Sequence, residues 1–181
     1  AVLAHGQDGG QPRMNGAFRR PPVAGWTFVH LEGEPANIGY QHGALLAEEI
    51  LEVKRIAELE LSHDTGKPWT FFRDSARDVL WPRIEQEYRL ELQGLADGLA
   101  SRGVALDLWD VVAVNALLEW SYFTAEYDRA RGVRPPGGGV VPERCSAFVA
   151  TGSATRDGRV VIAHNNWSSY MDGARWTIVF D

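Results

Sequence analysis

A proline- and glycine-rich run divides this chain into two parts that differ in hydrophobic periodicity. Residues 135–139 read PPGGG, which cannot hold regular structure because proline lacks a backbone donor and glycine has too much backbone freedom. Before this run, apolar residues recur at helical spacing. After it, they fall into short runs typical of strands. We therefore expect helices followed by a sheet, which makes an α+β fold.

The composition along the chain predicts four segments. Residues 1–24 are rich in Gly, Pro, Arg and Gln and predict a flexible lead-in. Residues 25–127 are expected to form a mostly helical part, and residues 128–144 a linker. Residues 145–181 are expected to begin a sheet.

The helical part should start with one strand and continue with three helices. WTFVHLEG (26–33) alternates apolar and polar residues like a strand. A long helix is expected from Pro35 to about His63, and a second from about 69 to 100, split at Pro82. Asp107 is a good N-cap for a third helix that ends near residue 127.

Two pairs of glycines predict close contacts between helices. Gly39 and Gly43 fall in the first expected helix, and Gly94 and Gly98 in the second. Glycine is costly inside a helix, so these positions indicate that another backbone comes close. We expect His42, beside the first pair, to pack between helices.

Three apolar runs follow the linker: SAFVA, RVVIAH and RWTIVF. Asp157-Gly158 is a strong hairpin signal between the first two. Three strands without covering layers do not make a stable sheet. The sequence therefore predicts that this chain is the amino-terminal part of a longer protein.

Cys145 is the only cysteine and stands at the first position of the first of these strands. Cleavage between Arg144 and Cys145 would give the residue a free α-amine, which titrates at pH ~7.7–8.0 and can take the proton of the thiol. This is the arrangement of an N-terminal nucleophile. The alternative is a buried cysteine with a structural role only.

His164 ends the second expected strand, so a hairpin would bring it beside Cys145. It could polarise the thiol or orient a substrate. The alternative is a strand-end histidine bonded to the backbone.

Four neighbours complete the candidate site. The side-chain amides of Asn165 and Asn166 can donate hydrogen bonds to an oxyanion or to the new amine, although Asn-Asn could instead simply end the strand. Ser146 can hydrogen-bond the amine or point elsewhere. Trp167 is expected to form the floor of a pocket. The catalytic candidates are thus Cys145, His164 and Asn166, with Asn165, Trp167 and Ser146 as substrate-binding residues.

Three segments carry a resemblance to a known family: IGYQHGALLAEEI, ELQGLADGLASRGVALDLWDVVAVNALLEW and CSAFVATGSATRDGRVVIAHNNWSSY. In this order they resemble the phospholipase B-like proteins, and also the related acyl-coenzyme A:6-aminopenicillanic acid acyltransferase family, over most of residues 26–170. The third segment is the most specific, because it joins a Cys-Ser start to His-Asn-x-Trp.

The resemblance implies an N-terminal-nucleophile hydrolase with a four-layer αββα sandwich. It implies a zymogen that cuts itself before Cys145 and whose two fragments stay associated. It further implies hydrolysis of a linear amide or ester bond in an acylated small molecule or a lipid, and thus lipid degradation. An acyltransferase that passes the acyl group to an amine is one alternative, and a non-enzymatic helical binding domain is another.

Several classes of function find no support. The net charge of −6 gives no electrostatic basis for binding nucleic acid. No apolar run approaches the roughly 20 residues of a membrane span. The histidines and the lone cysteine lack metal-site spacing, and nucleotide-binding glycine motifs are absent, so no cofactor is expected. AVLAHG at the start is compatible with the remnant of a signal-peptide cleavage site and favours an extracytoplasmic location, with a cytoplasmic one as the alternative.

Overall fold

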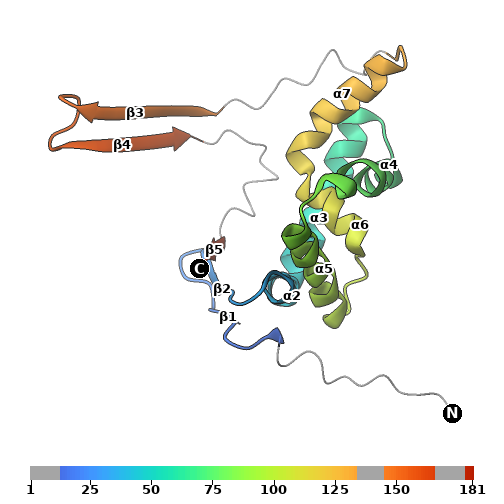
Figure 1. The fold of residues 1–181 in the computed structure, drawn as a ribbon, viewed down its shortest axis with the longest axis horizontal. Helices are drawn as coiled ribbons and strands as arrows, with labels where there is room; N and C mark the ends of the chain where they lie inside the picture. Colours follow the sequence, from blue (N-terminus) through green and yellow to red (C-terminus); the bar gives the residue numbers. More distant parts are fainter. Residues whose placement is uncertain (1–12, 134–144, 166–177) are drawn as a thin grey trace. The chain divides into compact units, whose positions relative to one another are not determined.

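A computed structural model describes residues 13–133, 145–165 and 178–181 (Figure 1). The chain divides into two compact units. Unit 1 comprises Ala1–Gly139 together with Thr177–Asp181, and unit 2 comprises Val140–Trp176. The described residues confirm an α+β protein. The finer expectation of an αββα sandwich finds no support in them.

Unit 1 consists mainly of helices. They are α2 (Pro35–Leu45), α3 (Ala47–Thr65), α4 (Trp69–Ser75), the π-helical turn η1 (Ala76–Leu80), the 3-10 turn η2 (Trp81–Arg83), α5 (Gln86–Ser101), α6 (Leu108–Asn115), the 3-10 turn η3 (Leu117–Glu119) and α7 (Trp120–Ala130). Their core centres on Phe72, Leu99, Val112 and Trp120, each almost fully buried. The predicted break at Pro82 is confirmed, since Pro82 lies in η2, between η1 and α5.

Two of the three expected helices are each divided in two. The first is interrupted at Leu46, whose φ of −123° and ψ of 27° leave the helical region. The Leu46 side chain is buried in the interior, and the break lets α2 follow α5 while α3 contacts α4, α6 and α7. The third is interrupted at Ala116. This second break lets the buried indole of Trp120 donate to the carbonyl of Ala113 at 2.7 Å. Tertiary packing thus overrides two continuous helical patterns.

The predicted contact between glycine-bearing helices is confirmed between α2 and α5. A Cβ atom at Gly39 would lie 1.9 Å from the carbonyl oxygen of Glu91, and one at Gly43 would lie 2.2 Å from that of Leu95. The second glycine pair makes the reciprocal contacts with the backbone of α2. From Gly39 to Gly43 the contacted residue moves from Glu91 to Leu95, in the same direction along the chain. The two helices therefore run parallel, with their backbones in contact.

A small sheet also belongs to unit 1. Its strands are β1 (Phe18–Arg19), β2 (Thr27–His30) and β5 (Ile178–Phe180), in the order β1-β2-β5. β1 is antiparallel to β2, and β5 is parallel to it. The strand expected at 26–33 is therefore confirmed, with shorter bounds. We expected the third apolar run after the linker to extend the hairpin. It instead forms β5, which pairs with β2. Val29 of β2 is fully buried.

The described part of the expected lead-in begins at Arg13 and contacts the helices. The guanidinium of Arg13 lies 4.2 Å from the ring centre of Tyr40 and pairs with Asp97 at 3.0 Å. The side-chain amide of Gln41 donates to the carbonyl of Arg13 at 2.8 Å. Polar composition predicts a mobile segment, but here the polar groups themselves hold the segment against α2 and α5.

Unit 2 contains a single antiparallel hairpin in its described part. β3 (Ser146–Gly152) and β4 (Gly158–Asn165) pair around a turn that includes Asp157. The Asp157 carboxylate accepts the backbone N–H of Arg159 at 3.1 Å, and Gly158 adopts a positive φ of 72°. The hairpin predicted from Asp157-Gly158 is confirmed.

The hairpin is apolar on both faces. Phe148 and Val161 lie on one face and Val149 and Ile162 on the other, and all four are exposed. The apolar composition of these strands predicts that they are buried in the folded protein. Two strands alone have no layer to cover them, so neither face is protected within the described residues.

Candidate functional site

The predicted nucleophile lies at the open end of the hairpin. Cys145 directly precedes β3, and its side chain is exposed. Next along the chain, Ser146 pairs with Asn165 and Ala147 pairs with His164. Because side chains alternate along a strand, continuing β3 by one residue places Cys145 on the face that carries Ala147 and His164.

This register makes Cys145 and His164 diagonal neighbours on one face. Such neighbours have backbones about 7–8 Å apart, a separation that long side chains can bridge. His164 is also exposed. A thiol and an imidazole at one end of one face can exchange a proton directly or through one water molecule.

The same register separates two other predicted residues from this pair. Ser146 and Asn165 lie opposite each other, and alternation directs both to the other face of the hairpin. The structure therefore does not place them beside His164. Arg144, Asn166 and Trp167, also predicted for the site, lie outside the described residues.

Two further findings concern the described part of the chain. It contains no group of three or more His, Cys, Asp or Glu side chains that could hold a metal ion. Nor does any of its helices combine the length and the apolar character needed to cross a membrane.

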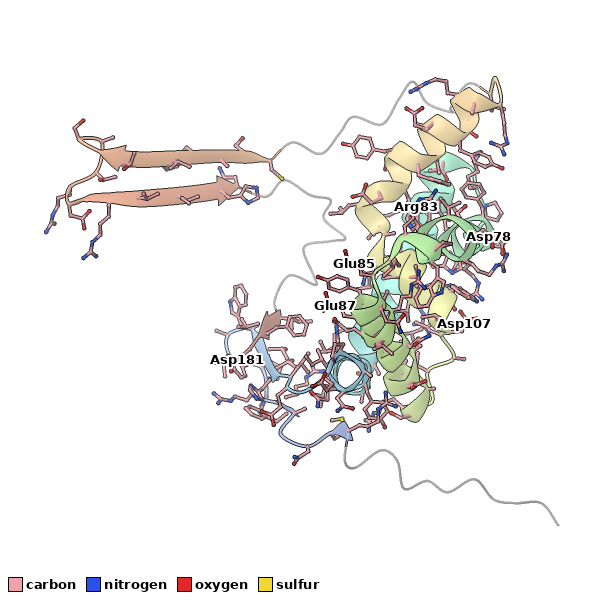
Figure 2. All side chains as sticks on the ribbon, in the orientation of Figure 1. Asp78, Arg83, Glu85, Glu87, Asp107 and Asp181 are labelled. Carbon is pink, nitrogen blue, oxygen red and sulfur yellow. The ribbon has the colours of Figure 1, made fainter. Side chains whose placement is uncertain are left out.

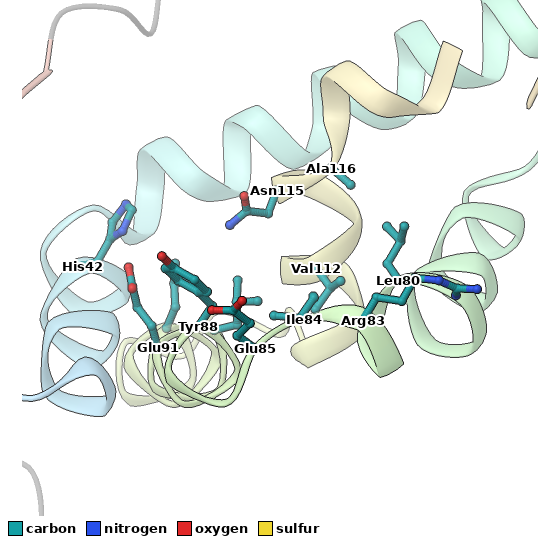
Figure 3. Close-up of a pocket in the computed structure, with 12 residues that line it drawn as sticks. His42, Leu80, Arg83, Ile84, Glu85, Tyr88, Glu91, Val112, Asn115 and Ala116 are labelled. Carbon is teal, nitrogen blue, oxygen red and sulfur yellow. The ribbon is translucent and has the colours of Figure 1, made fainter. Parts of the chain in front are cut away.

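Unit 1 contains a cavity of about 590 Å³ (Figure 3). Its walls come from α2, from the segment between η1 and the first half of α5, and from the end of α6. The apolar lining consists of Leu80, Ile84, Leu92, Leu95, Val112 and Ala116. The polar lining consists of His42, Arg83, Glu85, Tyr88, Glu91 and Asn115. Ligand sites commonly have this mixture and a volume of roughly 300–1,000 Å³.

His42 has two neighbours that define its character. Its ring meets Phe180 edge-on, with ring centres 5.1 Å apart. The ring thus packs against strand β5, whereas we expected it to pack between helices. Burial lowers the pKa of His42 below its ordinary value because the charged ring would lose hydration. The imidazole therefore faces the cavity as a neutral group at pH 7.

The sequence contains one weak signal for this cavity. Glu85, Tyr88 and Glu91 are spaced three residues apart at the start of α5, so they share one face of the chain there. Figure 3 shows their side chains along one wall of the cavity. Apolar residues beside a polar stripe ordinarily indicate only the edge of the solvent-exposed face of a helix. The pattern alone therefore does not predict the cavity.

Comparison with known proteins gives one distant relative. An uncharacterized protein of Archaeoglobus fulgidus is 27% identical over 155 aligned residues, and the match covers 78% of this chain. The matched region amounts to 24% of the length of that relative, so the chain spans about a quarter of it. No protein-family model matches the chain. No solved structure matches it.

Proposed function

We propose that this chain carries the nucleophile of a self-processing cysteine hydrolase of the N-terminal-nucleophile class. The bond that it cleaves would be a linear amide or ester of an acylated small molecule or lipid. The observation that carries the proposal is the hairpin register, which puts Cys145 and His164 at the same end of one face. The resemblance of residues 26–170 to the phospholipase B-like proteins supports it.

Self-processing would begin at the thiol of Cys145. Its sulfur attacks the carbonyl carbon of Arg144, and the bond from that carbon to the nitrogen of Cys145 breaks. The thiol proton passes to this nitrogen, with His164 positioned to relay it. Water then hydrolyses the thioester, which leaves a carboxylate on Arg144 and a free α-amine and thiol on Cys145.

Substrate hydrolysis would use the same atoms again. The sulfur attacks the acyl carbon of the substrate, and the α-amine takes the thiol proton and gives it to the leaving amine or alcohol. Water completes the cycle by releasing the acid from the thioester.

Intact mass and amino-terminal sequencing of the purified chain test the proposal. We expect two fragments, with Cys145 as the new amino terminus, and a Cys145→Ala variant that stays in one piece and hydrolyses no acyl amide or ester. His164→Ala should slow both reactions, while His63→Ala, an exposed histidine on α3, should slow neither. Cleavage at Arg144 in the Cys145→Ala variant would refute the mechanism.

Two alternatives give different results in the same assays. An acyltransferase would form an amide product when an amine acceptor is supplied together with the acyl donor. A purely binding domain would remain uncut, and its Cys145 would react with alkylating reagents at the rate of an ordinary thiol.

A further inference from the structure

The cavity of unit 1 has an acidic polar end. Glu85 and Glu91 both line it, and neither carboxylate has a hydrogen-bond or ion-pair partner among the described residues. Tyr88 lies between them, and His42 faces them from α2 (Figure 3). Glu85 is exposed and Glu91 is half-buried, and both carboxylates would attract a cation bound at this end of the cavity.

The cationic side chain in the lining does not neutralise this end. Arg83 lies beside Leu80, at the end of the cavity away from His42 (Figure 3). Its guanidinium donates a short hydrogen bond to the carbonyl oxygen of Val79. Nor does His42 supply a positive charge, because burial holds the pKa of its ring below the ordinary value.

Apart from Arg83 and the amide of Asn115, the remaining lining is hydrocarbon. Ile84, Leu92 and Leu95 continue from the acidic end, and Val112 and Ala116 close the other side from α6 and the residue after it. An occupant that carries a positive charge on an apolar chain would therefore match both the acidic end and the hydrocarbon part of this lining.

We propose that this cavity binds a primary ammonium attached to a linear hydrocarbon chain. The ammonium lies between the carboxylates of Glu85 and Glu91, and the chain lies against the apolar lining. This site belongs to the helical unit and does not depend on cleavage at Cys145. The three donors of an ammonium group match the carboxylates, and the phenol of Tyr88 can accept the remaining hydrogen bond.

Calorimetric titration of the full-length chain with decylammonium, below its micelle concentration, tests this directly. We expect saturable binding at one site per chain. Decanol and decanoate should bind at least about tenfold more weakly, because they lack the charge-assisted hydrogen bonds. Equal affinity for decanol would show that only the hydrocarbon is recognised and would overturn the proposal, as would tighter binding of decanoate.

Charge-removing variants locate the site. Glu85→Gln combined with Glu91→Gln should weaken decylammonium binding at least about tenfold, since each substitution removes one charged acceptor. Glu87→Gln is the matched control, because Glu87 is also at the start of α5 (Figure 2) but does not line the cavity. Unchanged affinity in the double variant, or no saturable binding to the original chain, would refute the assignment. Circular dichroism checks that each variant keeps its helices.

Discussion

Asp110 takes part in the cap of α6 and also binds a buried side chain of α4. Its carboxylate is almost fully buried and accepts the indole N–H of Trp69 at 2.7 Å. The Asp110 carboxylate also accepts a hydrogen bond from the backbone N–H of Asp107. The Asp107 carboxylate in turn accepts one from the backbone N–H of Asp110, so the two residues form a capping box. Arg73 makes ion pairs with both carboxylates. One side chain therefore fixes the start of α6 against α4.

Replacing Asp110 with Ala should lower the free energy of unfolding by about 3 kcal/mol. The change leaves the buried indole N–H of Trp69 without an acceptor and removes half of the capping box. Chemical denaturation followed by tryptophan fluorescence measures the loss. Asp78→Ala removes an exposed carboxylate paired with its neighbour Arg77 and should leave the midpoint unchanged. Similar effects of the two substitutions would contradict this role of Asp110.

His30 gives the β2–β5 pairing a dependence on pH. Its Nδ1 lies 3.1 Å from the carboxylate of Asp181 and its Nε2 lies 3.4 Å from that of Glu32. These contacts raise the pKa of His30 above its ordinary value of 6.5, with Asp181 making the larger contribution. Since protonated His30 is favoured in the folded state, this stabilisation is fully present below pH 6.5 and is lost as the pH rises through the folded-state pKa.

The His30 titration can be followed through its ring resonances by NMR. In the original chain the midpoint should lie above 6.5. Asp181→Asn should move the midpoint downward, because the principal negative partner is gone. A His30 midpoint that does not respond to Asp181→Asn would show that this contact is absent in solution.

At the scale of elements, the packing of α2 on α5 is the feature most sensitive to substitution. Gly98→Ala would place a Cβ atom 2.2 Å from the carbonyl oxygen of Tyr40, and backbone cannot move aside as a flexible side chain can. We expect a loss of about 3 kcal/mol or more in the free energy of unfolding. Without this contact, the same change would stabilise the helix by about 1 kcal/mol. The sign of the change in unfolding free energy, measured by thermal or chemical denaturation, therefore shows whether the close contact exists. Gln93→Ala, an exposed position on α5, should change stability by no more than about 0.5 kcal/mol.

Some elements could be foreseen from the sequence because their causes are local. The sequence predicts the N-cap at Asp107, the break at Pro82 and the hairpin turn at Asp157-Gly158, because each depends on the backbone of its immediate neighbours. The glycine pairs revealed a helix contact because only close packing explains their cost. The breaks at Leu46 and Ala116 could not be foreseen, since distant core residues decide them.

The candidate sites differ in the same way. The neighbourhood of Cys145 and His164 followed from a hairpin turn and strand alternation, both of which are local rules. The opposite orientation of Ser146 and Asn165 needed the register itself, because a shift of one residue reverses every side chain. The cavity required the relative positions of α2, α5 and α6, which no short pattern encodes.

At the scale of the whole molecule, unit 1 contains chain from both sides of unit 2. β5 comes after the hairpin in sequence but pairs with β2, aligned from Thr27 opposite Ile178. Two backbone hydrogen bonds extend the pairing, from Leu31 to Asp181 and from Asp181 to Val29, each 3.0 Å long. Cleavage between Arg144 and Cys145 would therefore cut the covalent chain without cutting this sheet.

The two fragments produced by such a cut should remain together under native conditions. A protease site introduced between Arg144 and Cys145 makes the test independent of self-processing. Size-exclusion chromatography should give one peak that contains both fragments, and denaturant should separate them. Deleting residues 178–181 should abolish the co-elution, because it removes the strand that joins the second fragment to β2. Co-elution that survives this deletion would show that other contacts hold the fragments.

The backbone contact between α2 and α5 also bears on the cavity beside it. A helix that meets its neighbour through four glycine positions can neither slide nor rotate without driving side chains into the opposing main chain. His42 on the first of these helices and Glu91 on the second are therefore kept at a constant spacing. Leu80 and Val112 stand on other elements and are not bound by that constraint. The charged end of the hollow is thus preorganised, whereas its hydrocarbon end can adapt to occupants of different length.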